Sequence, residues 1–316
     1  MATAAERGRQ AERPSEIPRV GWRDILVRTW NEIGNDHVSL IAAGVGFYAL
    51  LALFPGIAAM VAIWGLAFDP QQIEQQIATM SQFLPEQAAA IVTDQARKVA
   101  AGGGGLGWAA AFGILLALYS ASKGMKALIE GLNIIYDEEE KRGFIKLNLM
   151  ALGLTLGVIV AMIVALGVIV VVPIVLEFVG LGPIVDALVS ILRWPILFAG
   201  ALVMLAALYR FAPSRAPARW RWVTWGAAIA TLVWVLGSIA FSIYVRNFGS
   251  YNETYGSIGA VIILLMWLWL SAFIVLLGAE VNSEMEHQTE RDSTTGAPEP
   301  RGRRGAQVAD EVAESP

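Results

Sequence analysis

Residues 257–280 read SIGAVIILLMWLWLSAFIVLLGAE, and no charged side chain occurs in this stretch before its last residue, Glu280. A helix of about 20 apolar residues crosses the roughly 30 Å hydrocarbon core of a bilayer. Five more long apolar runs precede this one, at residues 38–68, 106–122, 147–172, 194–211 and 222–245. The sequence therefore predicts an all-α, polytopic membrane protein with six transmembrane helices.

Lysine and arginine are unevenly divided among the segments that connect these runs. Of the 23 in the chain, 19 lie in the two terminal segments and in the second and fourth connections, and the other three connections hold 4. Loops rich in Lys and Arg stay on the cytoplasmic side of a membrane. We therefore expect both termini to be cytoplasmic.

Composition narrows the class of protein further. Hydrophobic residues make up 56% of the 316, and the mean hydropathy is +0.57, more than a soluble domain needs. The chain has no cysteine, which excludes disulfides and thiolate metal sites. The formal net charge is −4, and without a strongly basic face we expect no nucleic-acid partner. We expect no metal and no cofactor.

The chain divides by composition into three parts. Residues 1–19 and 289–316 are polar and charged, and such segments bury too little apolar surface to fold alone. We expect both to be disordered cytoplasmic tails. The six-helix membrane domain then occupies residues 20–288.

The domain begins with an amphipathic segment at residues 20–33. Apolar and hydroxyl side chains recur at helical spacing near one face, at Trp22, Leu26, Thr29, Trp30 and Ile33. Charged side chains lie away from it, at Arg23, Asp24 and Arg28. This pattern is typical of a helix lying in the membrane interface, although a cytoplasmic extension packed on the bundle would share it.

The connection between the first two runs is long enough to form a cap outside the membrane. Its apolar residues recur at helical spacing, at Ile73, Ile77, Met80 and Leu84, and Pro85 suits the first turn of a second helix. We expect an amphipathic outer helical cap over residues 69–101, joined flexibly to the second span by the glycines at 102–105.

A polar stripe continues the second span beyond the membrane edge as a helix. Its members share about a third of the helical wheel: Tyr119, Ser122, Lys123, Lys126, Glu130 and Asn133. The two lysines fit an inner vestibule that coordinates an anion. They equally fit side chains that extend to anionic headgroups. The acidic run that follows, at 137–140, is typical of a solvated turn.

Prolines and glycines shape the other spans. Pro55 removes a helical hydrogen bond from the first span, which predicts a kink or a broken helix there, either for packing or beside a substrate cavity. The fourth span is best begun at Trp194 and Pro195, which leaves Arg193 at the outer interface. Gly153 and Gly157 have the spacing that lets membrane helices approach closely.

Three stretches together resemble a known family. They are AAGVGFYALLALFPGIAAM (42–60), YSASKGMKALIEGLNIIYDEEEKRGFIK (119–146) and residues 209–286, which contain YGSIGA (255–260) and LLGAE (276–280). The chain resembles the YihY/BrkB family of bacterial inner-membrane proteins, formerly labelled ribonuclease BN. The resemblance covers roughly residues 22–288 and implies six transmembrane helices in a bacterial cytoplasmic (inner) membrane.

The resemblance supplies positions but no agreed activity. Virulence and serum-resistance roles attach to some members of the family, and transport or export to others. The positions that match its motifs are Tyr48, Pro55, Lys123, Asn133, Tyr136, Tyr255, Gly256, Gly278 and Glu280. No catalytic role comes with them.

The nuclease label can be tested against the residues. Metal-dependent hydrolysis needs several His and carboxylate ligands converging on one site, and the chain has two His, His37 and His287. The acidic run has no adjacent basic groove for RNA, and no loop carries the nucleotide-phosphate pattern. The sequence therefore argues against ribonuclease activity, and we expect a protein that is not an enzyme.

The favoured function is transport or translocation of an anionic solute or lipid, because polar residues on membrane spans cost free energy unless they are used. With no ATP site, the driving force would be an ion gradient or the solute's own. The candidate substrate pathway consists of Tyr48, Pro55, Tyr119, Lys123, Lys126, Glu130, Asn133, Asn252, Glu253, Tyr255 and Glu280.

The alternative is a non-transporting envelope scaffold. It would use the basic inner loops, the interfacial helix and the outer cap to recruit proteins or anionic lipids. In either case the lipid bilayer is the first partner, and the sequence does not indicate the oligomeric state.

Overall fold

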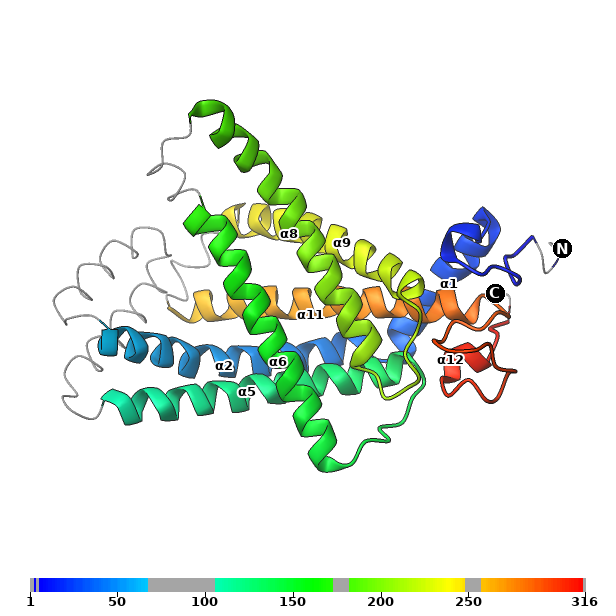
Figure 1. Ribbon diagram of the computed structural model, residues 1–316, viewed down its shortest axis with the longest axis horizontal. Coiled ribbons are helices and arrows are strands. Elements are labelled where there is room, and N and C mark those ends of the chain that lie inside the picture. Colours follow the sequence, from blue (N-terminus) through cyan, green and yellow to red (C-terminus); the bar gives the residue numbers. More distant parts are fainter. Residues whose placement is uncertain (1–2, 4–5, 68–105, 173–181, 248–256, 315–316) are drawn as a thin grey trace. The chain divides into compact units, whose positions relative to one another are not determined.

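The computed structural model describes residues 3, 6–67, 106–172, 182–247 and 257–314. In these residues the chain is all-helical, apart from one isolated antiparallel bridge between Ala218 and Thr294. The long helices (Figure 1) are α1 (Arg19–Asn35), α2 (Val38–Ala67), α5 (Leu106–Ile135), α6 (Phe144–Leu166), α8 (Pro183–Phe211), α9 (Trp220–Asn247) and α11 (Ser257–His287). The short ones are η1 (Pro14–Glu16), η3 (Gly167–Val171) and α12 (Gln307–Asp310).

The helices match a membrane-spanning protein in length and composition. Five of those described are long and apolar enough to cross a bilayer, and there are six when the bent pair α1 and α2 is one span. Helices suit this setting because every backbone N–H and C=O in lipid must find its partner within the segment. The predicted all-α polytopic class is thus confirmed.

The break in the first span lies before Pro55. Helix α2 continues through Pro55, so the helix is not broken at that residue, and the predicted kink there stays a prediction. Instead, α1 and α2 meet at a 62° bend where His37 adopts a positive φ of 52°, which few non-glycine residues do. The bend separates the amphipathic α1 from the apolar α2.

Helix α8 begins earlier than the sequence predicts. It starts at Pro183, after Gly182 with φ 92°, and continues through Pro195. Proline is favoured in the first helical turn, and Pro183 takes that place, whereas Pro195 lies in the interior. Arg193 therefore lies inside a long helix, with its guanidinium 5.3 Å from the centre of the Trp194 ring.

The chain forms two compact units, each built from several segments. Unit 1 comprises Met1–Ala42, Lys126–Leu236 and Ser271–Pro316, and unit 2 comprises Ala43–Met125 and Gly237–Leu270. Each unit therefore joins parts of the chain that are far apart in sequence, and the candidate site described below belongs to unit 1.

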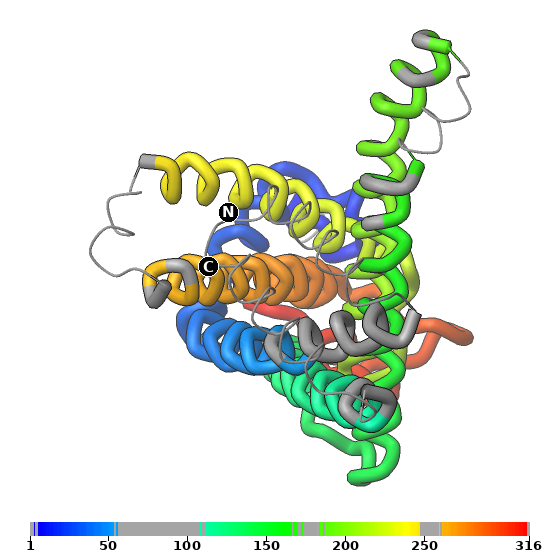
Figure 2. Tube along the Cα trace, turned by 90° about the vertical axis from the view of Figure 1, so that its left-hand side faces the viewer, coloured from blue at the N-terminus to red at the C-terminus, as the bar shows by residue number. Residues whose placement is uncertain are grey.

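In unit 1, helices α9 and α11 cross at two glycines, and Figure 2 shows the two helices side by side. A Cβ added to Gly226 would lie 2.1 Å from the carbonyl oxygen of Gly278, and one added to Gly278 would lie 2.5 Å from the Tyr209 hydroxyl. Asn282 joins the helices, since its Oδ1 accepts from the Gly226 N–H at 2.9 Å. Small residues thus bring these backbones into contact, as is common in membranes.

Helices α6 and α8 also pack against each other in unit 1 (Figures 1 and 2). Gly153 and Gly157 of α6 take no part in a close crossing, because a Cβ at either position meets nothing within 4 Å. The predicted role of this glycine pair in close packing is therefore wrong for the described residues. The close approach occurs at Gly226 and Gly278 instead.

The described parts of both terminal segments, which we expected to be disordered tails, form hydrogen bonds with other parts of unit 1. The C-terminal segment pairs with the α8–α9 connection, where the Arg219 N–H donates to the Ser293 carbonyl at 2.9 Å and the Ala216 N–H to the Gly305 carbonyl at 2.8 Å. The N-terminal segment joins it, because the Glu290 N–H donates to the Arg9 carbonyl at 2.8 Å. Backbone hydrogen bonds compensate for the low apolar content of these segments.

Unit 2 is built around close contacts of helix α2. A Cβ at Gly46 would lie 3.1 Å from the backbone nitrogen of Trp269 on α11. On the neighbouring α5, a Cβ at Gly124 would lie 3.4 Å from the Tyr48 Cβ. Tyr48, a candidate pathway residue, is thus half-buried against the residue that follows Lys123.

The glycine crossing in unit 1 gives a first prediction. Gly226→Ala places a methyl group where the Gly278 carbonyl already lies, and such overpacking costs about 1–3 kcal/mol. We expect a clear fall in the midpoint of thermal unfolding in detergent. Gly153→Ala is the matched control, since its methyl group meets open space and alanine favours helix. Equal effects of the two substitutions would contradict the close crossing.

Candidate functional site

Polar side chains that are almost fully buried gather at the C-terminal end of α11. We call them the α11 polar cluster: Glu280, Asn282, Glu284, Glu286 and Gln288, each at most 4% exposed. In a helix, residues four apart share a face. The cluster therefore has two faces, one formed by Glu280, Glu284 and Gln288 and the other by Asn282 and Glu286.

The first face is held by α1. Arg28 binds the Glu284 carboxylate through Nε and donates from Nη2 to Gln288 Oε1 at 2.8 Å. Gln288 Nε2 in turn donates to the Arg7 carbonyl at 2.7 Å, and the Arg7 guanidinium pairs with Asp24 at 2.6 Å. Charges removed from water need such pairing. Asp24 and Arg28 are buried and thus form the inward face of α1. The sequence pattern predicted only that these polar residues lie away from the apolar stripe.

The second face is held by the α8–α9 connection. Arg215 Nη2 pairs with Glu286 Oε2 at 2.6 Å, and these side chains are 2% and 0% exposed. The Ser293 hydroxyl donates to the same carboxylate oxygen. The Arg215 guanidinium also lies 4.8 Å from the centre of the Tyr136 ring, a cation–π arrangement. Burial is the main influence on Arg215 and opposes its charge, but Glu286 outweighs it and raises the pKa of Arg215.

Glu280 lies one helical turn before Glu284 on the first face. It is 1% exposed, and its Oε1 has no hydrogen-bond partner among the described residues. Arg28 is paired with Glu284, and His287 Nδ1 lies 3.3 Å from Glu284 Oε1. Asp36 is half-buried, and burial raises its pKa to about 6.

The residues of the predicted polar stripe all lie on one continuous helix, because α5 continues to Ile135. Lys123 lies 5.3 Å from the centre of the Tyr119 ring, and Tyr119 is exposed. Lys126 binds Asn148 Oδ1 of α6 and lies 6.0 Å from the centre of the Phe144 ring. Glu130 is exposed. Lys126 thus has partners within its own chain.

Asn133 is 5% exposed and joins two connections of unit 1. Its Oδ1 accepts from the Ser214 N–H at 2.8 Å, and its Nδ2 donates to Glu140 Oε2 at 3.1 Å. Glu140 also accepts two hydrogen bonds from the Arg142 guanidinium, at 2.7 and 2.6 Å. Of the acidic run, Asp137, Glu139 and Glu140 are exposed, as in a solvated turn, whereas Glu138 is buried. Asn133 serves as a structural link to the α8–α9 connection.

The other candidates divide between described and undescribed parts of the chain. Pro55 is half-buried inside α2. Three candidates lie outside the described residues, namely Asn252, Glu253 and Tyr255. The outer cap at 69–101 and the glycines at 102–105 also lie outside them. What the sequence suggests for these residues stays a prediction.

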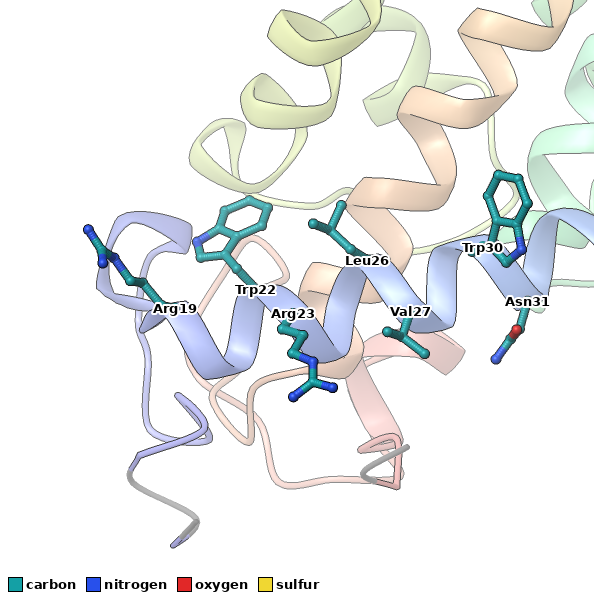
Figure 3. A pocket seen from close by; sticks show the side chains of 7 residues that line it. All are labelled: Arg19, Trp22, Arg23, Leu26, Val27, Trp30 and Asn31. Atoms are coloured by element: carbon teal, nitrogen blue, oxygen red, sulfur yellow. The ribbon is translucent and has the colours of Figure 1, made fainter. Parts of the chain in front are cut away.

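Helix α1 carries a surface groove of about 580 Å³ on the face opposite Arg28. Figure 3 shows its lining residues in rows along the helix: Arg19, Trp22, Arg23, Leu26, Val27, Trp30 and Asn31. Trp30 is 78% and Leu26 58% exposed. At one end of the groove, the ring of Trp22 lies beside that of Trp225, with the two ring centres 5.7 Å apart. Exposed tryptophan beside arginine is typical of a membrane-interface helix.

The sequence alone did not identify some residues of the site. Glu280 was found because it ends an apolar run, but Asp36, Arg28, Arg215 and Glu286 were not recognised. The signal available was the four-residue spacing of acidic and amide side chains after Glu280. Within the described residues, no three His, Asp or Glu side chains are arranged to hold a metal ion.

Comparisons with known proteins agree on one family. A family model described as virulence factor BrkB matches residues 29–303. The chain is 34% identical over 247 residues to the ribonuclease-like protein YfkH of Bacillus subtilis, covering 77% of this chain and 88% of that one. It is 24% identical over 267 residues to the UPF0761 membrane protein of Tolumonas auensis, covering 81% and 83%. No solved structure matches.

The Arg215–Glu286 pair gives a second prediction. Arg215→Met leaves the Glu286 carboxylate buried without its cation, and such a change costs about 3–5 kcal/mol. Unfolding in detergent should show this loss. Arg13→Met is the control, because Arg13 and Glu16 are 64% and 49% exposed and 4.0 Å apart. A surface change of this kind stays within about 0.5 kcal/mol. If Arg215→Met were equally mild, the pair would not stabilise unit 1.

Glu140 gives a prediction about pH. Burial opposes its charge, but hydrogen bonds from Arg142 and Asn133 prevail and lower its pKa to about 2. A carboxyl group with a lowered folded-state pKa stabilises the fold above its ordinary pKa near 4.5, and this contribution disappears as pH falls toward 2. Unfolding midpoints should therefore drop between pH 5 and 2 less steeply for Glu140→Gln than for the unchanged protein. Identical slopes would argue against this role.

Proposed function

Because the chain belongs to the virulence factor BrkB family of integral membrane proteins, we propose that it transports or translocates an anionic lipid or solute. The proposed site of action is the bacterial inner membrane, with both termini in the cytoplasm. The uneven distribution of Lys and Arg supports this orientation.

The α1 groove carries the proposal and favours a lipid. Arg19 and Arg23 offer positive charge to a headgroup, and the exposed Trp30, Leu26 and Val27 offer apolar surface to an acyl chain. Basic residues near a membrane surface attract anionic lipids by about 1 kcal/mol each. The groove also lies on the helix that leads directly into α2. An anionic lipid bound here would be at the entrance of the membrane domain.

The buried charges of unit 1 support transport over simple adhesion. Ionisable side chains on membrane helices are costly and mark ion or substrate pathways, and Glu280 is 1% exposed on α11. Lys126 and Asn133 are less suited than the sequence suggested, because both are bound to neighbouring segments of the chain. We therefore propose that the lipid contacts α1 and not α5.

The scaffold alternative rests on the same groove. All seven lining residues belong to one helix, so a lipid could be held there without crossing the membrane. The protein would then attach to anionic lipid regions and recruit partners. The ribonuclease-like name belongs to the Bacillus relative, and we do not extend that activity to this chain, which has two histidines.

The experiment uses the purified full-length protein in proteoliposomes. Movement of fluorescent phosphatidylglycerol and phosphatidylcholine between leaflets is followed by dithionite quenching from outside. The unchanged protein should move the anionic lipid faster. Arg19→Gln with Arg23→Gln removes two charges, about 2 kcal/mol of attraction, which corresponds to roughly 30-fold weaker binding. Movement of phosphatidylglycerol should fall accordingly.

The control pair is Arg13→Gln with Arg303→Gln, two exposed arginines outside the groove. It should leave lipid movement unchanged. If the unchanged protein binds phosphatidylglycerol vesicles but moves neither lipid, the scaffold alternative holds. If the two double variants behave alike, the groove is not the lipid site.

A further inference from the structure

We propose that Arg193 of helix α8 binds the phosphate group of a membrane phospholipid. Arg193 lies within Ala187–Phe211, the part of α8 that is long and apolar enough to cross a bilayer. Its guanidinium lies 5.3 Å from the centre of the Trp194 ring, and Trp194 is 61% exposed. The two residues therefore present a positive charge and an aromatic ring at the surface of a membrane helix.

Arg193 has no anionic partner in the part of the chain that the structure describes. None of the ion pairs there includes it, and its Nε is buried without a hydrogen-bond partner. Arg28 and Arg215 differ from it, because each of them pairs with a glutamate. A charged side chain on a membrane helix pairs with another group or extends to the headgroups. Arg193 therefore needs an anion from its surroundings.

The place of Arg193 along α8 puts it near one face of the membrane. Arg210 follows 17 residues later on the same helix, which is about 25 Å along the axis. The Arg210 guanidinium lies 4.8 Å from the centre of the Trp220 ring, so each end of the span has an arginine beside a tryptophan. Their separation is close to the roughly 30 Å thickness of a hydrocarbon core, and tryptophan is enriched at both of its interfaces.

The face at Arg193 is opposite to the one that carries the terminal segments. The C-terminal end of α8 leads into a connection that binds the C-terminal segment, since the Ala216 N–H donates to the Gly305 carbonyl at 2.8 Å. Side chains of a helix tilt toward its N-terminus, which for α8 is the end away from this connection. Arg193 therefore extends toward the headgroups of the opposite face.

The surface that follows Arg193 along α8 suits an acyl chain. Ile196 and Gly200 come three and seven residues later, on the same helical face. Ile196 is 58% exposed, and a Cβ at Gly200 would meet nothing within 4 Å. A phosphate at Arg193 would thus have its acyl chain along an open apolar strip of the same helix. This continuity favours a phospholipid over a free phosphate ion.

The role of this site in lipid movement rests on the proposed function. The α1 groove belongs to a helix that binds the end of α11 and the terminal segments. A lipid that leaves this groove for the other leaflet needs a second position at the opposite face, and Arg193 offers one. Binding at Arg193 does not itself depend on transport, so the two ideas can fail separately.

The test is native mass spectrometry of the full-length protein in detergent, titrated with dioleoyl phosphatidylglycerol. Arg193→Gln should weaken binding of the tightest lipid about fivefold, the contribution of one arginine near anionic lipid. Arg193→Lys keeps the charge and should restore most of the affinity. Arg13→Gln is the matched control, because the Arg13 side chain is 64% exposed in the N-terminal segment. It should bind lipid like the unchanged protein.

Two further ligands test the chemistry of the site. Dioleoylglycerol has the same acyl chains without the phosphate, and it should bind the unchanged protein more weakly than phosphatidylglycerol does. Equal affinities would overturn the proposal. Displacement of phosphatidylglycerol by millimolar inorganic phosphate would also overturn it, since the site would then take the free ion. The same holds if Arg193→Gln and Arg13→Gln bind phosphatidylglycerol alike.

Asp186 is the alternative partner within the chain, because it lies seven residues before Arg193. If Asp186→Asn and Arg193→Gln lower the midpoint of thermal unfolding equally and neither weakens lipid binding, the two side chains pair with each other and the proposal is overturned. If Arg193→Gln weakens binding of phosphatidylglycerol but leaves its movement between leaflets unchanged, the binding site stands and its role in movement fails.

Discussion

The structure depends on how unit 1 compensates the charges that it buries at the end of α11. Four ionised or amide side chains there are each matched by a specific partner from another part of the chain: Arg28 for Glu284 and Gln288, Arg215 for Glu286, and the backbone of α9 for Asn282. An unmatched buried charge would cost several kcal/mol. The described parts of both terminal segments contribute to this compensation through hydrogen bonds to the end of α11.

Glu280 belongs to the same cluster but differs in its partners. It is 1% exposed, and its Oε1 has no hydrogen-bond partner among the described residues. Ionisable groups on membrane helices are rare and mark ion or substrate pathways, which is the reason for keeping Glu280 in the proposed pathway.

The sequence predicts the spans well because the length of an apolar run is a local property. Helices α2, α5 and α11 begin where the apolar runs begin. The sequence-based prediction fails for the start of α8, which is Pro183 and not Pro195. It also fails at the polar cluster, because Arg28 and Glu284 are 256 residues apart and no local pattern pairs them. Asn133 was correctly selected as unusual, but its partners Ser214 and Glu140 come from the connections, which periodicity does not describe.

The closure of unit 1 by both chain ends has a consequence for biosynthesis. Arg9 binds the carbonyls of His287 and Ala313, so Arg9 is synthesised well before the residues that it binds. The spans can enter the bilayer one after another, but the assembly around α11 is completed only when α11 and the segment after it have been made. Until then Arg28 lacks Glu284, and a nascent chain stalled before α11 would expose that arginine to chaperones and proteases.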